Sequence, residues 1–343
     1  SMRRVMAVTA LVTSLGLAAP AQADVTPVTK TGWSRWSGAD RYATAVAISK
    51  ATFTQSDFVY VVSGENFPDG LAAGPVAGVN QAPVLLTKRD SVPTVVADEL
   101  ARLDPMTVIV VGGTTVITDA TVDALEAASG APAVRFAGVN RYATAVRMAI
   151  AMEEVQTAYI VSGESFPDAL AAGPAAGSEY APLLLTKKTS LPPETRAYLD
   201  GRPLDRIVIV GGTLAISQDV EDTIADLVPS ATIERYAGAT RYDTAALIAI
   251  STWPLGADTV FYAPGANFPD GLSATPAAMV NNAPLLLTQP SCHPLETTIA
   301  TEDLAPLRQV ATGASTVTYA GSRTCGPEPT YPFPVDLDCK DFA

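Results

Sequence analysis

The chain has 343 residues, of which 48% are apolar and 17% are charged, so it can form sizeable buried cores. Its 22 basic and 35 acidic residues give a net charge of −13 at pH 7. This acidic balance argues against nucleic acid as a partner and against a basic surface for membrane binding.

The first 23 residues have the features of a secretion signal. Arg3 and Arg4 precede an apolar run, Val5–Leu17, and Ala21–Ala23 fits a small-x-small cleavage site. The run is too short to serve as a membrane anchor. Without the two arginines, the mature chain has 20 basic and 35 acidic residues, a net charge of −15. We therefore expect a secreted protein that has no membrane contact after cleavage and is held at the cell wall or cell surface non-covalently.

One eleven-residue stretch occurs three times, beginning at Arg35, Arg135 and Arg235, so the period is 100 residues (135−35 and 235−135). This period is longer than that of solenoid repeats and is long enough for a small domain with its own core. We expect a monomer with an internal threefold repeat. The predicted divisions are a signal peptide (1–23), a polar segment (24–32), repeats at 33–132, 133–232 and 233–321, and a Cys- and Pro-rich tail (322–343).

Each repeat alternates short apolar strands with helices of ten to twelve residues, which is typical of an α/β fold with a parallel sheet covered on both faces. Asp40, Asn140 and Thr240 occupy one position and are good helix N-caps. In the first repeat we predict helices at Arg41–Ala51 and Leu71–Val79, strands at Phe58–Val62, Pro83–Thr87 and Val108–Val111, a helix after Val92-Pro93 capped by Ser91, and a helix from Thr118 to Ala128.

The third repeat departs from this pattern at its end. We place its third strand at Val317–Gly321, where Ala320-Gly321 replaces the Gly-Gly of the other repeats, and we expect no helix after it. The three cysteines, Cys292, Cys325 and Cys339, all lie in the last quarter of the chain, and export permits disulfides. Loops after neighbouring parallel strands leave one edge of a sheet, which favours a Cys292–Cys325 bond. A Cys325–Cys339 bond is the alternative, and an odd count leaves one cysteine over.

Repeated arginines are the first candidate functional residues. Six of the 20 mature basic residues lie at threefold-repeated positions in an otherwise acidic chain. Guanidinium groups bind both oxygens of a phosphate or carboxylate, so six of them on one axis would form a site for an anionic polymer. The structural alternative is that Arg41 pairs with Asp69 of its own repeat, or with the next repeat, and holds loops in place. The six residues are Arg35, Arg41, Arg135, Arg141, Arg235 and Arg241.

The aspartates of a repeated Phe-Pro-Asp motif are the second candidates: Asp69, Asp168 and Asp270. They could contribute to the same site. An Asp after Pro and before a small-residue helix is alternatively a cap that accepts hydrogen bonds from the first N–H groups of the helix.

Catalytic patterns are not found in the sequence. The glycine-rich turns match neither dinucleotide nor P-loop fingerprints. His293 is the only histidine, which is too few for a hydrolytic zinc site or a Ser-His-Asp triad repeated threefold. We therefore expect no enzyme activity, no cofactor and no metal, and three equivalent repeats favour a binding function.

Four motifs recur in order: R-x-x-G-x-x-R-Y-x-T-A, G-x-x-F-P-D-[GA]-L, A-P-[VL]-L-L-T and V-G-G-T. Over residues 33–321 the chain resembles the cell wall binding repeat 2 family. The resemblance implies Rossmann- or Toprim-like α/β units with parallel sheets in a pseudo-threefold arrangement. It also implies non-covalent attachment to the Gram-positive cell wall through an anionic secondary polymer, teichoic-acid-like or polysaccharide, or through another peptidoglycan-linked glycan. Carried over by position, the polymer-binding leucines would be Leu85, Leu86, Leu184, Leu185, Leu286 and Leu287.

Two other functions remain open from the sequence. One is a cell wall hydrolase of the N-acetylmuramoyl-L-alanine amidase type, which would need a unique catalytic cluster. The other is a surface protein whose repeats present loops to a protein partner.

Overall fold

The computed structural model describes residues 32–313, 324 and 325. Within these residues there are three four-stranded sheets in which all strands are parallel, with helices between the strands. This is the α/β fold of three repeated units that the sequence predicts. The predicted signal peptide, the strand at Val317–Gly321 and Cys339 lie outside the described residues. None of the described helices is long and apolar enough to cross a membrane.

The first sheet has the strand order β3-β2-β4-β5, and the second repeats it as β7-β6-β8-β9. The first group comprises α2 (Arg41–Thr52), β2 (Phe58–Ser63), α3 (Pro68–Val79), β3 (Val84–Thr87), α4 (Thr94–Leu103), β4 (Thr107–Val111), α5 (Asp119–Ser129) and β5 (Ala133–Phe136). The second comprises α6 (Arg141–Ile150), β6 (Thr157–Ser162), α7 (Pro167–Ser178), β7 (Leu183–Thr186), α8 (Pro193–Leu199), β8 (Arg206–Val210), α9 (Gln218–Leu227) and β9 (Thr232–Tyr236).

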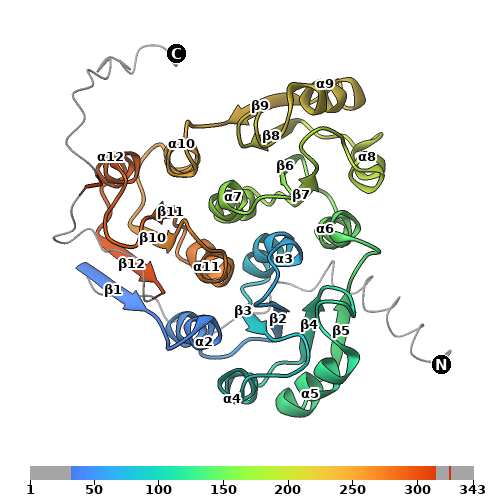
Figure 1. Cartoon of the computed structure of the whole chain (residues 1–343), viewed down its shortest axis with the longest axis vertical. Coiled ribbons are helices and arrows are strands. Elements are labelled where there is room, and N and C mark those ends of the chain that lie inside the picture. The colour runs from blue at the N-terminus through green and yellow to red at the C-terminus, as the bar shows by residue number, and fades with distance from the viewer. Residues whose placement is uncertain (1–31, 314–323, 326–343) are drawn as a thin grey trace.

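The third sheet closes the chain into a ring. Its order is β1-β12-β10-β11, so the first described strand pairs with the last one (Figure 1). In the register of this pair, Arg35 lies opposite Ala311. The elements are β1 (Gly32–Trp36), α10 (Arg241–Thr252), β10 (Thr259–Pro264), α11 (Pro269–Val280), β11 (Leu285–Thr288), α12 (Leu295–Leu304) and β12 (Arg308–Thr312).

The sheets are offset from the sequence repeats. The strand that opens each repeat is the outer strand of the preceding sheet: β5 pairs with β4, β9 with β8, and β1 with β12. The following helix, by contrast, packs on the next sheet, as α2 does on β3. Each repeat is therefore shared between two sheets, which ties neighbouring units together.

Three helices rich in alanine and glycine, α3, α7 and α11, pack together at the centre of the ring (Figure 1). Their small residues let the helices approach closely. Gly74 of α3 and Gly173 of α7 both face Thr275 of α11, since a Cβ built on either glycine would lie 2.9 Å from the Thr275 Cγ2 atom. Thr275 therefore fills the space that the two glycines leave on the axis.

Two local predictions were wrong. Helix α4 begins at Thr94 with Pro93 at its N-cap position and no side-chain cap, so Ser91 does not cap it. The third strand of the third repeat is β12, which ends before Gly313 rather than at Gly321. Gly313 has a positive φ of 85° and is the counterpart of Gly112 (φ 128°). Strand β12 begins with two polar residues, Arg308 and Gln309, so its sequence is not a continuous apolar run.

The Cys292–Cys325 disulfide is present, with a Cα–Cα distance of 5.1 Å, which confirms the preferred pairing. Beside it, the Cys325 backbone N–H donates to the carbonyl oxygen of His293 at 2.7 Å. The bond therefore fixes the loop after β11 to a segment that follows β12 in sequence.

Candidate functional site

The carboxyl ends of the strands and the amino ends of the helices that follow them lie at one edge of each sheet. The predicted N-caps hold the helices there. Asp40 accepts a hydrogen bond from Ala43 N at 2.8 Å, and Asn140 accepts one from Ala143 N at 2.9 Å. Thr240 forms a full capping box with Asp243. As a result, an arginine occupies the first helical position of α2, α6 and α10.

These arginines, Arg41, Arg141 and Arg241, are called the arginine ring below. Their helices α2, α6 and α10 surround the three central helices (Figure 1). Each arginine donates from Nη1 to a backbone carbonyl oxygen at the end of a strand, that of Gly64, Gly163 or Gly265. The guanidinium groups are thereby held in equivalent positions in all three units.

A cluster of three phenylalanines lies between the amino ends of the central helices. Phe67, Phe166 and Phe268 contact one another, with ring centroids 5.5, 5.8 and 5.9 Å apart. The Arg41 Cζ atom lies 5.8 Å from the Phe268 centroid. Cations are attracted to aromatic faces at such distances, so Arg41 of the arginine ring adjoins this cluster. Sequence reasoning included the phenylalanine in a motif but gave it no role; its threefold recurrence was the available signal.

The aspartates of Phe-Pro-Asp connect successive units. Asp69 interacts with Thr144 and Arg141 of the next repeat, and Asp168 interacts with Arg241 and Thr244. Asp270 interacts with Arg41 and so completes the circle. Of the structural alternatives for Arg41, the structure therefore favours contact with a neighbouring unit over Asp69 of its own repeat.

The interpretation of these aspartates as helix caps was wrong. The N-cap positions belong to the phenylalanines, no side chain caps these helices, and each aspartate lies within the first turn. Burial raises the pKa of Asp69 and Asp168, whereas the neighbouring threonine and arginine lower it. Burial raises the pKa of Asp270 to about 6, against the lowering effect of Arg41.

The first arginine of each pair has structural contacts. From Nη1, Arg35 donates to Gly313 O at 2.6 Å, Arg135 to Gly112 O at 2.7 Å and Arg235 to Gly211 O at 2.7 Å. Arg135 also pairs with Asp119 at 3.0 Å, and Arg235 pairs with Glu221. These arginines thus satisfy strand-end carbonyls and hold the outer strands against their sheets.

The six predicted polymer-binding leucines are core residues. Leu85, Leu86, Leu184, Leu185, Leu286 and Leu287 each have 0% exposed surface. They lie on β3, β7 and β11, which helices cover. A polymer at the surface cannot touch them, so any role must be to position the residues that follow these strands.

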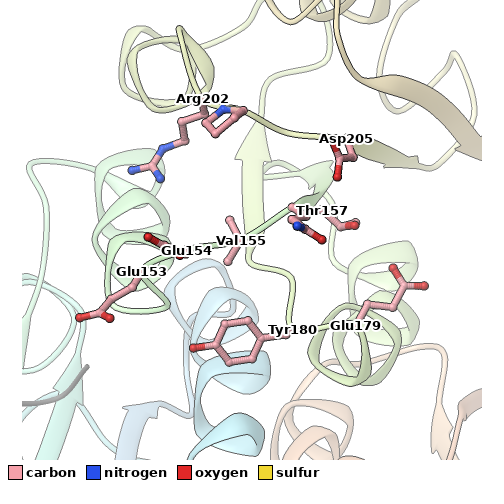
Figure 2. Close-up of a pocket in the computed structure, with 10 residues that line it drawn as sticks. Glu153, Glu154, Val155, Thr157, Glu179, Tyr180, Arg202 and Asp205 are labelled. Atoms are coloured by element: carbon pink, nitrogen blue, oxygen red, sulfur yellow. The ribbon is translucent and has the colours of Figure 1, made fainter. Parts of the chain in front are cut away.

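A hollow of about 700 Å³ opens at the opposite, amino edge of the second sheet (Figure 2). Its lining includes four carboxylates, Glu153, Glu154, Glu179 and Asp205, and one arginine, Arg202. Glu179 also pairs with Arg206 at 2.5 Å. The acidic lining does not suit an anionic ligand, which separates this hollow from the arginine ring. In the described part of the chain, no group of three metal-ligating side chains occurs.

The sequence matches the family of the cell wall binding domain 2 (CWB2) three times, at residues 35–122, 135–221 and 235–322. The chain belongs to this family. The matched segments begin at the three repeated arginines and cover most of the chain. This membership supports cell wall binding and leaves the particular ligand open.

Similar proteins include two from Bacillus subtilis (strain 168). The N-acetylmuramoyl-L-alanine amidase LytC is 34% identical over 74% of this chain and 50% of its own length. The amidase enhancer is 30% identical over 79% of this chain and 37% of its own length. The chain thus spans half or less of these relatives.

Two solved structures from Clostridium difficile have the same architecture. Cwp6 matches with a TM-score of 0.79 and 26% identity, over 86% of this chain and 49% of that one. Cwp8 matches with a TM-score of 0.75 and 27% identity, over 82% and 49%. Together with the family, these neighbours point to a binding role and to a cell wall or surface location.

Proposed function

We propose that the protein is secreted and attaches non-covalently to the Gram-positive cell wall by binding an anionic secondary polymer at the arginine ring. The observation that carries this proposal is three guanidinium groups held equivalently at the ends of three strands, in a chain with net charge −13. Ordered arginines suit phosphate or carboxylate groups because their geometry is fixed before binding. The amino ends of the surrounding helices add partial positive charge at this edge.

The deciding experiment is sedimentation of the protein with purified wall sacculi, before and after acid extraction of the secondary polymer. We expect binding to native sacculi and loss of binding to extracted sacculi. If native and extracted sacculi bound the protein equally well, the secondary polymer would not be its ligand. Measurements at low and high salt should show weaker binding at high salt, because salt screens exposed charges.

The role of the arginines is tested by the triple variant Arg41→Gln, Arg141→Gln, Arg241→Gln. If each contributes one charge-assisted hydrogen bond, the variant should bind native sacculi at least roughly tenfold more weakly. The matched control is Lys50→Gln, Arg147→Gln, Arg196→Gln, which removes the same charge from exposed positions elsewhere on α2, α6 and α8. A control that loses as much affinity would show that net charge, rather than the ring, governs binding.

Amidase activity is the alternative, since LytC is an N-acetylmuramoyl-L-alanine amidase. We propose that this chain binds the wall without cleaving it. The equivalence of the three units supports this proposal, because a hydrolase concentrates its reactive groups at one place. Release of soluble fragments from peptidoglycan by the pure protein, with loss of release after chelation, would contradict it.

A further inference from the structure

One position distinguishes the third unit from the other two at the same edge. The residue directly after the second strand is Lys88 in the first unit and Lys187 in the second, but Gln289 in the third. Comparison of the three units therefore shows what a lysine at this position contributes.

Both lysines are held over a buried tyrosine. The Lys88 Nζ atom lies 5.9 Å from the centroid of Tyr42, and the Lys187 Nζ atom lies 5.9 Å from that of Tyr142. Each tyrosine follows an arginine of the ring, so lysine and arginine belong to one surface. A Cβ built on Gly64 would contact both Tyr42 and the Arg41 side chain, at 2.7 and 3.3 Å. The same packing surrounds Gly163 in the second unit.

The loop that carries each lysine is fixed in the same way. Glu65 accepts a hydrogen bond at Oε2 from the backbone N–H of Arg89, at 3.3 Å, and Glu164 accepts one from that of Lys188, at 3.0 Å. The third unit has Ala266 in place of the glutamate. It therefore lacks both the cation and the carboxylate that orders the loop.

The third unit uses this loop differently. The Gln289 Oε1 atom lies 3.9 Å from Cys292 Sγ, and Gln289 N donates to Cys292 O at 3.3 Å. Cys292 in turn forms the disulfide with Cys325. The loop that presents a cation in two units is thus a cross-linked structural element in the third.

Lys88 and Lys187 are exposed, and neither forms an ion pair with any described carboxylate. Their neighbour Arg89, by contrast, is paired with Asp90 at 2.7 Å. Exposed charges of this kind contribute little to the stability of the fold, so the position of the two ammonium groups is not explained by stability. They are well placed to receive anionic groups from outside.

We propose that Lys88 and Lys187 form two equivalent subsites, each of which binds one anionic group of the wall polymer beside the arginine ring, while the third unit has no such subsite. This inference rests on the proposed function. The three units would then contribute differently to binding, although their folds are related by threefold symmetry. A polymer segment would contact the lysine of the first unit and that of the second, and the ring between them.

The test compares the double variant Lys88→Gln, Lys187→Gln with the unchanged protein in sedimentation with native sacculi over a range of salt concentrations. Two exposed charge contacts should change affinity by roughly five- to tenfold at low salt. The difference should shrink as salt rises, because both contacts are screened. Circular dichroism and thermal unfolding check that the variant remains folded.

Gln289→Ala and the pair Lys50→Gln, Arg147→Gln are the controls, and both should bind as the unchanged protein does. If the unchanged protein does not distinguish native from extracted sacculi, the proposed function fails and the subsites fail with it. If it does distinguish them, but the lysine variant binds equally well at every salt concentration, only the subsites are overturned. If Gln289→Ala weakened binding as much as the lysine variant does, the proposed difference between the third unit and the other two would be wrong.

Discussion

Arg35 donates a hydrogen bond from Nη1 to the carbonyl oxygen of Gly313 at 2.6 Å, across 278 positions of the sequence. The same bond joins Arg135 to Gly112 and Arg235 to Gly211 over 23 and 24 positions. A hydrogen bond that is local in the first two sheets therefore joins distant parts of the sequence in the third sheet. It links the first described strand to the end of the last one.

Trp36→Ala should weaken the attachment of β1 to the third sheet. Trp36 packs edge-on against Phe261 with centroids 5.4 Å apart, so its removal leaves a gap between β1 and the core of the third sheet. We expect a loss of about 2–3 kcal/mol in the free energy of unfolding, less than for a fully buried tryptophan. Urea unfolding measures this loss of stability. Phe136→Ala is the matched control, because Phe136 has the same position in β5 as Trp36 has in β1. An unchanged midpoint for Trp36→Ala would show that β1 does not stabilise the ring.

Asp270→Asn should stabilise the protein near neutral pH. The folded pKa of Asp270, about 6, lies above its ordinary value of 3.8, so the folded state binds the proton more tightly than the unfolded state. The stability associated with that proton is fully present below about pH 4 and is lost as pH rises to about 6. The variant should therefore gain up to about 3 kcal/mol above pH 6 and nothing below pH 4.

Thermal unfolding from pH 4 to pH 8 measures this effect, with exposed Asp98→Asn as the control for loss of one negative charge. A loss of stability in Asp270→Asn at pH 7.5 would mean that attraction to Arg41 outweighs the cost of burial. Asp69 and Asp168 have pKa values raised for the same reason, so their contributions have the same sign.

Gly74→Ala should have opposite effects in two backgrounds. In the unchanged protein the new Cβ would lie 2.9 Å from Thr275 Cγ2, and such overpacking costs about 1–3 kcal/mol. In a Thr275→Gly background the contact is absent, and alanine should gain up to about 1 kcal/mol over glycine within a helix. Chemical denaturation of the four proteins gives the coupling energy. A coupling near zero would contradict the close approach of α3 and α11.

Cys325→Ser should destabilise the protein through the unfolded state. The disulfide spans 33 positions, and a loop of this length corresponds to at most about 4 kcal/mol of stabilisation in the chain-entropy model. Thermal unfolding without reductant compares the variant with the unchanged protein. Peptide mapping under the same conditions should recover Cys292 linked to Cys325. Recovery of a Cys325–Cys339 peptide instead would contradict this pairing.

Local features could be predicted from the sequence because local interactions decide them. Asp40 and Asn140 cap their helices as expected, since a short polar side chain directly before a helix can accept from its first N–H groups. The strand predicted at Phe58–Val62 is present as β2, because continuous apolar runs occur where both faces of a sheet are covered.

Features that depend on the neighbouring unit could not be predicted in this way. Asp69 looks like a cap by its position after Pro68, but its carboxyl group interacts with Thr144 of the next repeat. Leu85 is part of a motif that the family resemblance assigns to binding, yet its side chain is completely buried. Sequence spacing also does not show that Phe67 meets its two counterparts, because their contact depends on the closed ring.

The offset between repeats and sheets determines where this chain can be divided. A fragment cut at the sequence period would carry a strand that belongs to another sheet and would lack its own outer strand. Cuts in the loops at 37–40, 137–140 and 237–240 instead keep each of the first two sheets in one piece and separate only β1 from the other strands of the third sheet. Because β1 completes the third sheet from the other end of the chain, these three loops are equivalent points on a circle. A circular permutant that opens at 137–140, with its original ends joined, would keep every strand pairing of the ring.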